Sequence, residues 1–255
     1  MRRALDGRKR GLTWRLRESL EDLEYADDIC LVSHKYEHMH GKLDTLWKES
    51  KKAGLVINSL KTEEIRVHKI VNQGLRLHGE GIKRSSDLCY LGSVVAEYGG
   101  TSKEVNSRIQ KARRSFSKLR KVWLNKSLRK YTKIKIFNAC VKSVLFYGCE
   151  TWLVTNEIQH TVQTSVNRCL RYILRIWWPN IISNKDLWKV TGQEDINLEI
   201  RKRKFGWIGH TLRKEDGEIP KRSYFGPPRE IEREEDRKTA GEDRKLRKRV
   251  EAGMN

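Results

Sequence analysis

The sequence predicts an α+β fold, in which short strands come first and amphipathic helices follow. Residues 1–100 contain alternating and continuous apolar runs of strand length, together with one segment that has the pattern of a helix. From residue 101 to about 176, apolar residues recur at steps of three and four, as they do in consecutive amphipathic helices. A run of strands followed by a run of helices is typical of α+β proteins rather than of alternating α/β folds.

Two further regions complete the predicted organisation. Residues 177–214 hold a Trp-Pro turn and a basic helix, and we expect them to form a small basic module. In residues 215–255 nearly all apolar residues are scattered singly among charges, so we expect a disordered tail or a solvated helix. The apolar fraction of the whole chain, 37%, is low for a single well-filled core.

The charge balance is the strongest compositional signal. The 255 residues include 54 Lys and Arg against 33 Asp and Glu, a formal net charge of +21. A surplus of this size favours a polyanionic partner, most often nucleic acid, because each phosphate contacted by Lys or Arg releases counterions. No apolar run is long enough to span a bilayer, and the N-terminal segment lacks the apolar core of a signal peptide. We therefore expect no membrane partner and an intracellular location, in the nucleus or cytoplasm.

The five cysteines predict neither a disulfide framework nor a zinc finger. Their number is odd, their spacing is irregular and no CxxC pair occurs. Four of the five lie inside apolar patterns, so we expect buried thiols in a reducing compartment. The residues are Cys30, Cys89, Cys140, Cys149 and Cys169.

Residues 101–123 predict the first helix of the helical stretch. Thr101 and Glu104 have the spacing of a capping box. An apolar stripe follows at helical steps, formed by Val105, Ile109, Ala112, Phe116, Leu119 and Trp123. Five basic residues fall off the stripe, where we expect exposed flanks: Arg108, Lys111, Arg114, Lys118 and Lys121. Such helices either border a nucleic-acid groove or carry an ordinary solvated surface, and the net charge of the chain favours the groove.

Two more helices are predicted downstream. The segment LRKYTKIKIFNACVKSVLFYG repeats the pattern, and Gly148 is its expected stop. A third helix begins at Asn156 and has three basic residues outside its apolar stripe, namely Arg168, Arg171 and Arg175. The eight tryptophans are expected mostly to fill the core, although the adjacent pair at 177–178 also suits stacking on nucleic-acid bases.

Two adjacent aspartates, Asp27 and Asp28, lie between two strand-like runs. Before them, Leu23 and Tyr25 alternate with polar residues as in a half-buried strand, and residues 29–32 then form a continuous apolar run. The pattern predicts a hairpin with the aspartates at its tip. Adjacent carboxylates repel each other, so they either face solvent in an ordinary turn or hold a divalent cation. Mg²⁺ suits the second interpretation, because it is usually held by one or two carboxylates together with substrate phosphates.

A helix is predicted directly after the hairpin. Ser33 has the position of its N-cap, the helix covers residues 34–53, and Gly54 ends it. Residues 55–58, Leu-Val-Ile-Asn, then predict another strand.

Several short motifs occur in a fixed order around these elements. They are GLTW at 11–14, YADD at 25–28, GLVIN at 54–58 and YLGS at 90–93. Downstream come NSRIQKARRSFSKL, KIKIFNACVKSVLFYGCETW and FGWIGHTLRK. The ordered series resembles the C-terminal half of reverse transcriptases from non-LTR (LINE-type) retrotransposons, over about residues 11–214.

The resemblance implies an RNA-directed DNA polymerase, that is, a nucleotidyltransferase that uses Mg²⁺ or Mn²⁺ in a two-metal mechanism. Residues 1–100 would be part of the polymerase palm, and residues 101–176 a helical thumb. The partners implied are an RNA template and a DNA primer. The basic flanks of the thumb would contact phosphates, which carry no sequence information.

The resemblance also assigns roles to residues of the predicted palm. Asp27 and Asp28 match the metal-binding box, where paired ions activate the primer 3′-hydroxyl. Lys61 matches a position near the incoming nucleotide, although it also fits a surface lysine after a strand. The hairpin that supports the primer end is matched by Tyr90, Leu91 and Gly92.

The upstream part of the family pattern is missing from the sequence. In the family this part contains a further aspartate on an earlier palm strand, a fingers subdomain and an endonuclease, whereas only 24 residues precede Tyr25 here. We therefore expect a truncated reverse transcriptase that is inactive alone, unless an intact element-encoded polymerase supplies the missing half in trans. The alternative is a non-enzymatic RNA- or DNA-binding remnant, in which the thumb and basic helices keep their affinity.

Overall fold

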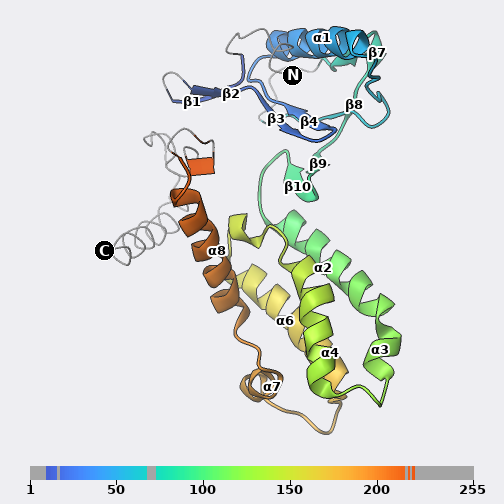
Figure 1. Cartoon of the computed structure of the whole chain (residues 1–255), viewed down its shortest axis with the longest axis vertical. Helices are drawn as coiled ribbons and strands as arrows, with labels where there is room; N and C mark the ends of the chain where they lie inside the picture. Colours follow the sequence, from blue (N-terminus) through green and yellow to red (C-terminus); the bar gives the residue numbers. More distant parts are fainter. Residues whose placement is uncertain (1–9, 16–17, 68–72, 216–217, 219, 222–255) are drawn as a thin grey trace. The chain divides into compact units, whose positions relative to one another are not determined.

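The chain contains both helices and strands, so the predicted α+β class is confirmed. The structure is a computed structural model that describes residues 10–15, 18–67, 73–215, 218 and 220–221. It divides into two compact units, residues 1–100 and residues 101–255 (Figure 1). The predicted tail falls mostly on residues 222–255, which lie outside the described part of the chain.

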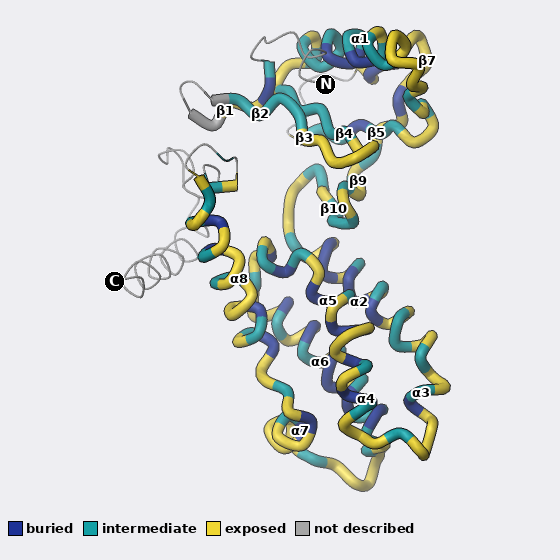
Figure 2. The backbone as a smooth tube through the Cα atoms, viewed as in Figure 1, coloured by how far each residue is buried: buried dark blue, intermediate teal, exposed yellow. Residues whose placement is uncertain are grey.

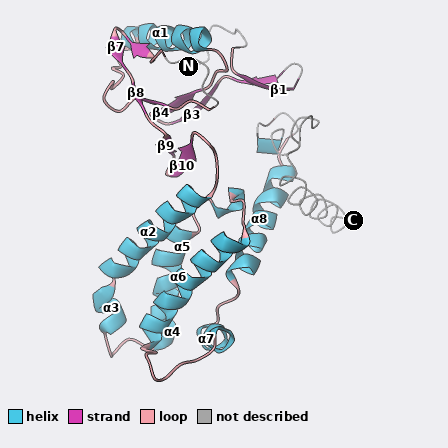
Figure 3. Cartoon of the chain, turned by 180° about the vertical axis from the view of Figure 1, so that it is seen from behind, coloured by secondary structure: helices cyan, strands magenta, loops and turns pink. Residues whose placement is uncertain are grey.

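The N-terminal unit contains short strands that pair two by two (Figure 3). Four pairs are antiparallel, namely β1–β2, β3–β4, β6–β7 and β9–β10, and β5–β8 is parallel. The strands are β1 (Leu12–Arg15), β2 (Glu18–Leu20), β3 (Asp22–Tyr25), β4 (Asp28–Leu31), β5 (Glu63–Glu64), β6 (Arg76–Leu77), β7 (Glu80–Gly81), β8 (Lys83–Arg84), β9 (Asp87–Tyr90) and β10 (Ser93–Ala96). Within the described residues, no sheet has more than two strands.

One helix among the described residues of this unit, α1 (Tyr36–Lys52), covers its small core. Its buried Leu43 packs with three buried residues of the strand region, Leu75, Leu77 and Ile82. The predicted N-cap is wrong: Lys35 takes that position, and the Ser33 hydroxyl donates instead to the carbonyl oxygen of Arg10 at 2.7 Å. The same hydroxyl accepts a long hydrogen bond from the Lys35 N–H group at 3.4 Å, before the first residue of α1, so it does not cap the helix.

The strand predicted at residues 55–58 does not form. Gly54 adopts a φ of +73°, which ends the helical conformation as predicted, and an irregular segment follows. Leu55 is 67% exposed and Val56 94% exposed. No strand in the described part of the chain pairs with this segment, and an apolar run without a hydrogen-bonded neighbour cannot become a strand.

The second unit is helical and holds the main core. Its helices are α2 (Ser102–Lys118), α3 (Arg120–Leu124), α4 (Lys130–Phe137), a π-helical turn (Asn138–Lys142), α5 (Ser143–Leu145), a 3₁₀ turn (Cys149–Thr151), α6 (Asn156–Leu174), α7 (Asn184–Thr191) and α8 (Ile196–Leu212). Figure 2 shows buried residues along one side of α2, α4 and α6, as expected for amphipathic helices. The stripe predicted for α6 is confirmed, since Val162, Val166, Leu170 and Ile173 are all buried.

The predicted capping box at the start of α2 is wrong. Thr101 makes no side-chain bond to its own helix, because its hydroxyl accepts a hydrogen bond from the Leu153 N–H group at 3.0 Å. Glu104 turns forward along the helix, where its carboxylate meets the Arg108 guanidinium at 2.6 Å. Both side chains are therefore used for contacts within the folded unit rather than for capping.

The middle of this unit follows the predicted helix with one irregularity. The helix from Lys130 passes through a π-helical turn before α5, and Gly148 adopts a φ of +73° at the expected stop. Residues 177–214 form two helices, α7 and α8, instead of the one predicted. Leu187 and Ile196 from these helices belong to the same core as α2, α4 and α6. Among the described residues, no helix combines the length and apolar character that crossing a membrane requires.

The cysteines are all free, but fewer of them are buried than predicted. Cys149 is buried, and burial raises the pKa of its thiol to about 12. Cys30 and Cys169 are half-buried, whereas Cys89 and Cys140 are exposed. Cys89 lies in β9, opposite Val94 of β10.

Candidate functional site

The YADD motif forms the tip of the β3–β4 hairpin, as predicted. Tyr25 pairs with Asp28 across the ladder, so Ala26 and Asp27 form a two-residue turn. Ala26 has a φ of +54°, the left-handed region in which side chains are disfavoured by about 1–2 kcal/mol. Two-residue hairpin turns require a positive φ at this position, because their twist must match that of the strands. The turn therefore places the two aspartates at the end of a strained, tightly defined loop.

The carboxylates of this turn are open to a ligand. Asp27 and Asp28 are both exposed, and neither carboxylate forms a hydrogen bond or ion pair with any residue that the structure describes. All their oxygen lone pairs remain available to a hard cation such as Mg²⁺, which needs only one or two protein carboxylates when substrate phosphates complete its shell. Over the described ranges, no group of three acidic, histidine or cysteine side chains is placed to hold a metal ion.

A buried lysine fixes the base of this hairpin. Lys42 of α1 has a side chain that is only 3% exposed, and its ammonium lies 2.6 Å from the Glu21 carboxylate. It also donates to the carbonyl oxygens of Glu21, at 3.0 Å, and Val32, at 2.7 Å. These two residues flank the β3–β4 hairpin at its open end, and the Val32 N–H group donates to Glu21 O at 3.0 Å. Lys42 thus ties both ends of the hairpin to the helix.

The same contacts lower the pKa of Glu21. Burial raises the pKa of this carboxyl, but hydrogen bonds from Lys42, Ser19 and two backbone N–H groups outweigh burial and lower the pKa to about 2 from 4.5. The Ser19 hydroxyl donates at 2.6 Å. A carboxylate that accepts several hydrogen bonds is stabilised in its charged form.

A second hairpin, β9–β10, contacts the first. Its turn contains Leu91 at φ +49° and Gly92 at φ +82°, the conformation of a type I′ turn. The Tyr90 hydroxyl donates to the carbonyl oxygen of Leu23 in β3 at 3.1 Å. Burial raises the pKa of Tyr90, and the neighbouring Cys30 and Asp28 raise it further. The YLGS and YADD motifs, predicted separately from the sequence, therefore lie side by side.

Lys61 is not drawn into this arrangement. It is exposed in a turn, where its N–H group donates to the carbonyl and side-chain oxygens of Asn58, both at 3.2 Å. No contact among the described residues joins it to the aspartates.

The predicted basic flank of α2 is only partly exposed. Arg108 is wrongly placed on that flank: it is 5% exposed, pairs with Glu104 and lies over the Tyr147 ring at 4.3 Å. Glu104 stands four residues before Arg108, a spacing that favours ion pairs, so the sequence held the signal for this pairing. Lys111 is half-buried, and the remaining three residues, Arg114, Lys118 and Lys121, are exposed.

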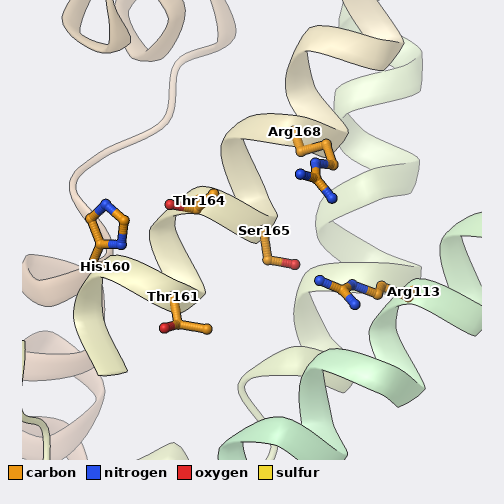
Figure 4. Close-up of a pocket in the computed structure, with 6 residues that line it drawn as sticks. All are labelled: Arg113, His160, Thr161, Thr164, Ser165 and Arg168. Atoms are coloured by element: carbon orange, nitrogen blue, oxygen red, sulfur yellow. The ribbon is translucent and has the colours of Figure 1, made fainter. Parts of the chain in front are cut away.

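The helical unit has two further features, an exposed tryptophan pair that the sequence offered as a stacking platform and a hollow that it did not indicate. Trp177 is 57% exposed and Trp178 85% exposed, so this pair does not fill the core. A hollow between α2 and α6 is lined by Arg113, His160, Thr161, Thr164, Ser165 and Arg168 (Figure 4). No local pattern in the sequence singles out Arg113 among the basic residues of α2, because the residues that share its hollow belong to another helix.

Comparisons with known proteins give two matches. Residues 115–147, from the second half of α2 through α5, match the model of a domain of unknown function, DUF6451. Over 208 residues the chain is 23% identical to an uncharacterized transposon-derived protein of Caenorhabditis elegans, F52C9.6, covering 78% of this chain and 74% of the relative. No solved structure matches the chain.

Proposed function

We propose that this chain is the palm-hairpin and thumb portion of a non-LTR retrotransposon reverse transcriptase, an RNA-directed DNA polymerase. The observation that carries the proposal is the hydrogen bond from Tyr90 to the Leu23 carbonyl oxygen, which joins the hairpins of the two motifs through residues 67 positions apart in the chain. In the family that the sequence resembles, one of these motifs binds metal and the other supports the primer end. The similarity to a protein described as transposon-derived supports the transposon part of the proposal.

The proposed roles follow from the geometry of the two hairpins. Asp27 and Asp28 would hold the divalent ions, which activate the primer 3′-hydroxyl and neutralise charge on the attacking and leaving oxygens when bound. The two-residue turn places both aspartates at the hairpin tip, and the backbone of Leu91 and Gly92 would support the primer end. Lys61 would act on the departing pyrophosphate, which requires its exposed turn to approach the hairpin during the reaction.

A third carboxylate completes the metal site in this family. We therefore propose that the chain polymerises DNA together with a second polypeptide that supplies this group, such as an intact element-encoded polymerase, and that it does not extend a primer alone. The test is Mg²⁺-dependent primer extension on an RNA template, with the chain alone and mixed with the N-terminal palm and fingers of an intact LINE-type element.

The decisive variant is Asp27→Asn with Asp28→Asn, and Glu37→Gln with Glu80→Gln is the matched control. Glu37 and Glu80 are exposed carboxylates of the same unit, so the control removes the same charge without touching the hairpin tip. The polymerase proposal is supported if the mixture extends the primer, if the aspartate variant abolishes this extension and if the control keeps it. Mn²⁺ binding, followed by electron paramagnetic resonance, should show the same pattern. Extension and Mn²⁺ binding that do not depend on Asp27 and Asp28 would refute it.

The alternative is a non-enzymatic nucleic-acid-binding remnant. It is favoured by the three exposed cations of α2 and α3, Arg114, Lys118 and Lys121, none of which pairs with an acidic residue within the described part of the chain. For every phosphate that the protein no longer neutralises, the slope of log affinity against log salt should fall by about 0.9. Salt-sensitive duplex binding that weakens when these residues become alanine, without any primer extension, would favour this alternative.

A further inference from the structure

A hollow of about 210 Å³ opens on the helical unit between α2 and α6. Its wall on α6 carries hydroxyl and basic side chains at helical spacing, because Thr161, Ser165 and Arg168 follow one another at steps of four and three residues. Arg113 reaches into it from α2. Figure 4 shows the two guanidinium groups extending toward each other, with the Ser165 hydroxyl directed between them.

The two arginines form an uncompensated pair of like charges. Neither Arg113 nor Arg168 makes an ion pair or hydrogen bond with any other described residue. Both lower the pKa of the Cys169 thiol, against the stronger effect of burial, so both guanidinium groups lie close to this one side chain. Arg108 on the same helix shows the contrast, because Glu104 neutralises it at 2.6 Å. A concave site with two unpaired guanidinium groups favours an anion.

We propose that this hollow binds a backbone phosphate of a nucleic acid. A guanidinium fork matches the oxygens of a phosphate in a bidentate manner, and two forks facing each other can bind one phosphodiester from both sides. The Ser165 hydroxyl supplies a further donor between them, and Thr161 and Thr164 also line the hollow. The hollow is open to solvent, so it accepts a phosphate that belongs to a longer chain. The proposal rests on the proposed function, in which the helical unit lies on a template–primer duplex.

The test uses the full chain and a short fluorescent RNA–DNA duplex, with affinity measured by anisotropy over a series of salt concentrations. Arg113→Ala with Arg168→Ala should weaken binding by about tenfold and reduce the salt slope by about 1 to 2. The control, Arg129→Ala with Lys130→Ala, removes the same charge from two exposed residues of the same unit and should weaken binding by less than about threefold. The variant with lysine in place of both arginines keeps the charge but removes the guanidinium forks. Its affinity for the duplex should therefore lie between that of the double-alanine variant and that of the control.

The result that overturns the proposal is an equal effect of the arginine pair and the control pair. If Lys111, Arg114, Lys118 and Lys121 still contribute in that case, the helical unit binds nucleic acid through another surface and the proposed function stands. If no variant changes duplex binding, both the phosphate site and the proposed function are refuted. Thermal stabilisation by inorganic phosphate that depends on Arg113 and Arg168, without any effect of these residues on duplex binding, would show a site for free phosphate and would also overturn the assignment.

Discussion

The substitution Lys42→Met should unfold the N-terminal unit selectively. Lys42 is the buried residue that ties the aspartate hairpin to α1, through the Glu21 carboxylate and two backbone carbonyl oxygens. Methionine has a similar length and fills a similar space, so this substitution removes the polar contacts with little change in packing.

The expected cost is about 3 kcal/mol of unfolding free energy. Removing one partner of a buried ion pair costs about 3–5 kcal/mol, because the remaining charge stays buried without compensation. Glu21 keeps hydrogen bonds from the Ser19 hydroxyl and the Arg10 N–H group, so the lower end of this range applies. The core of the unit contains few buried residues, and a decrease of this size is therefore a large fraction of its stability.

Amide hydrogen exchange measures this effect unit by unit. The Val32 N–H group, which donates to Glu21 O at 3.0 Å, should exchange at least about a hundredfold faster in the variant, while amides of α6 keep their protection. The control is Lys52→Met on the same helix, where the side chain is 72% exposed and pairs with Glu49. Exposed pairs contribute about 0.2–1 kcal/mol, so this control should change little. Equal effects of the two substitutions would refute the role given to Lys42.

Three other perturbations have expected outcomes. Ala26→Gly should stabilise the N-terminal unit by about 0.5–1 kcal/mol in the same exchange experiment, because glycine removes the strain at φ +54°. The pKa of Glu21 is about 2 in the folded unit against an ordinary value of 4.5. This carboxylate therefore stabilises the unit above pH 4.5, and the stabilisation disappears as the pH falls toward 2. The substitution Glu21→Gln should flatten this dependence of stability on pH. Phe137→Ala, at a fully buried position of α4, should cost the helical unit about 3–5 kcal/mol in urea unfolding followed by tryptophan fluorescence.

The helical unit was the part of the fold best predicted from the sequence. Its apolar residues repeat at the period of a helix, and burial follows that period in α6 from Val162 to Ile173. Gly148 marked a helix end correctly, because only a positive φ is needed there and glycine adopts it without strain. These signals depend on a residue and its near neighbours in the chain, which the sequence contains in full.

Predictions that depended on distant partners were less successful. Ser33 lies two residues before the N-cap of α1, and Thr101 takes the N-cap position of α2 without a side-chain capping bond. Their hydroxyls contact Arg10 and Leu153, which are far away in the chain. Residues 55–58 had the composition of a strand, yet a strand exists only where another strand pairs with it. No local pattern states which distant group arrives at a given side chain.

The candidate site shows the same division. The hairpin at Asp27 and Asp28 was predicted from local patterns, the hairpin at Gly92 was implied by the family resemblance, and both are present. The hydrogen bond from Tyr90 to Leu23, which joins them, and the Lys42 contacts at the base of the first hairpin could not be predicted, since each connects separate elements.

The strained turns explain why the N-terminal unit needs its buried ion pair. Ala26 and Leu91 both have positive φ at hairpin tips, where glycine would cost nothing, and each costs about 1–2 kcal/mol. A unit with so small a core cannot tolerate two such residues unless other contacts hold the hairpins in place. Lys42 and Glu21 supply such contacts at one hairpin, and Tyr90 attaches the other hairpin to it. The tip of the β6–β7 hairpin carries the same strain, since His78 has a φ of +51°, so positive φ is a general property of the hairpins of this unit and does not by itself mark the tips to which polymerase roles are proposed.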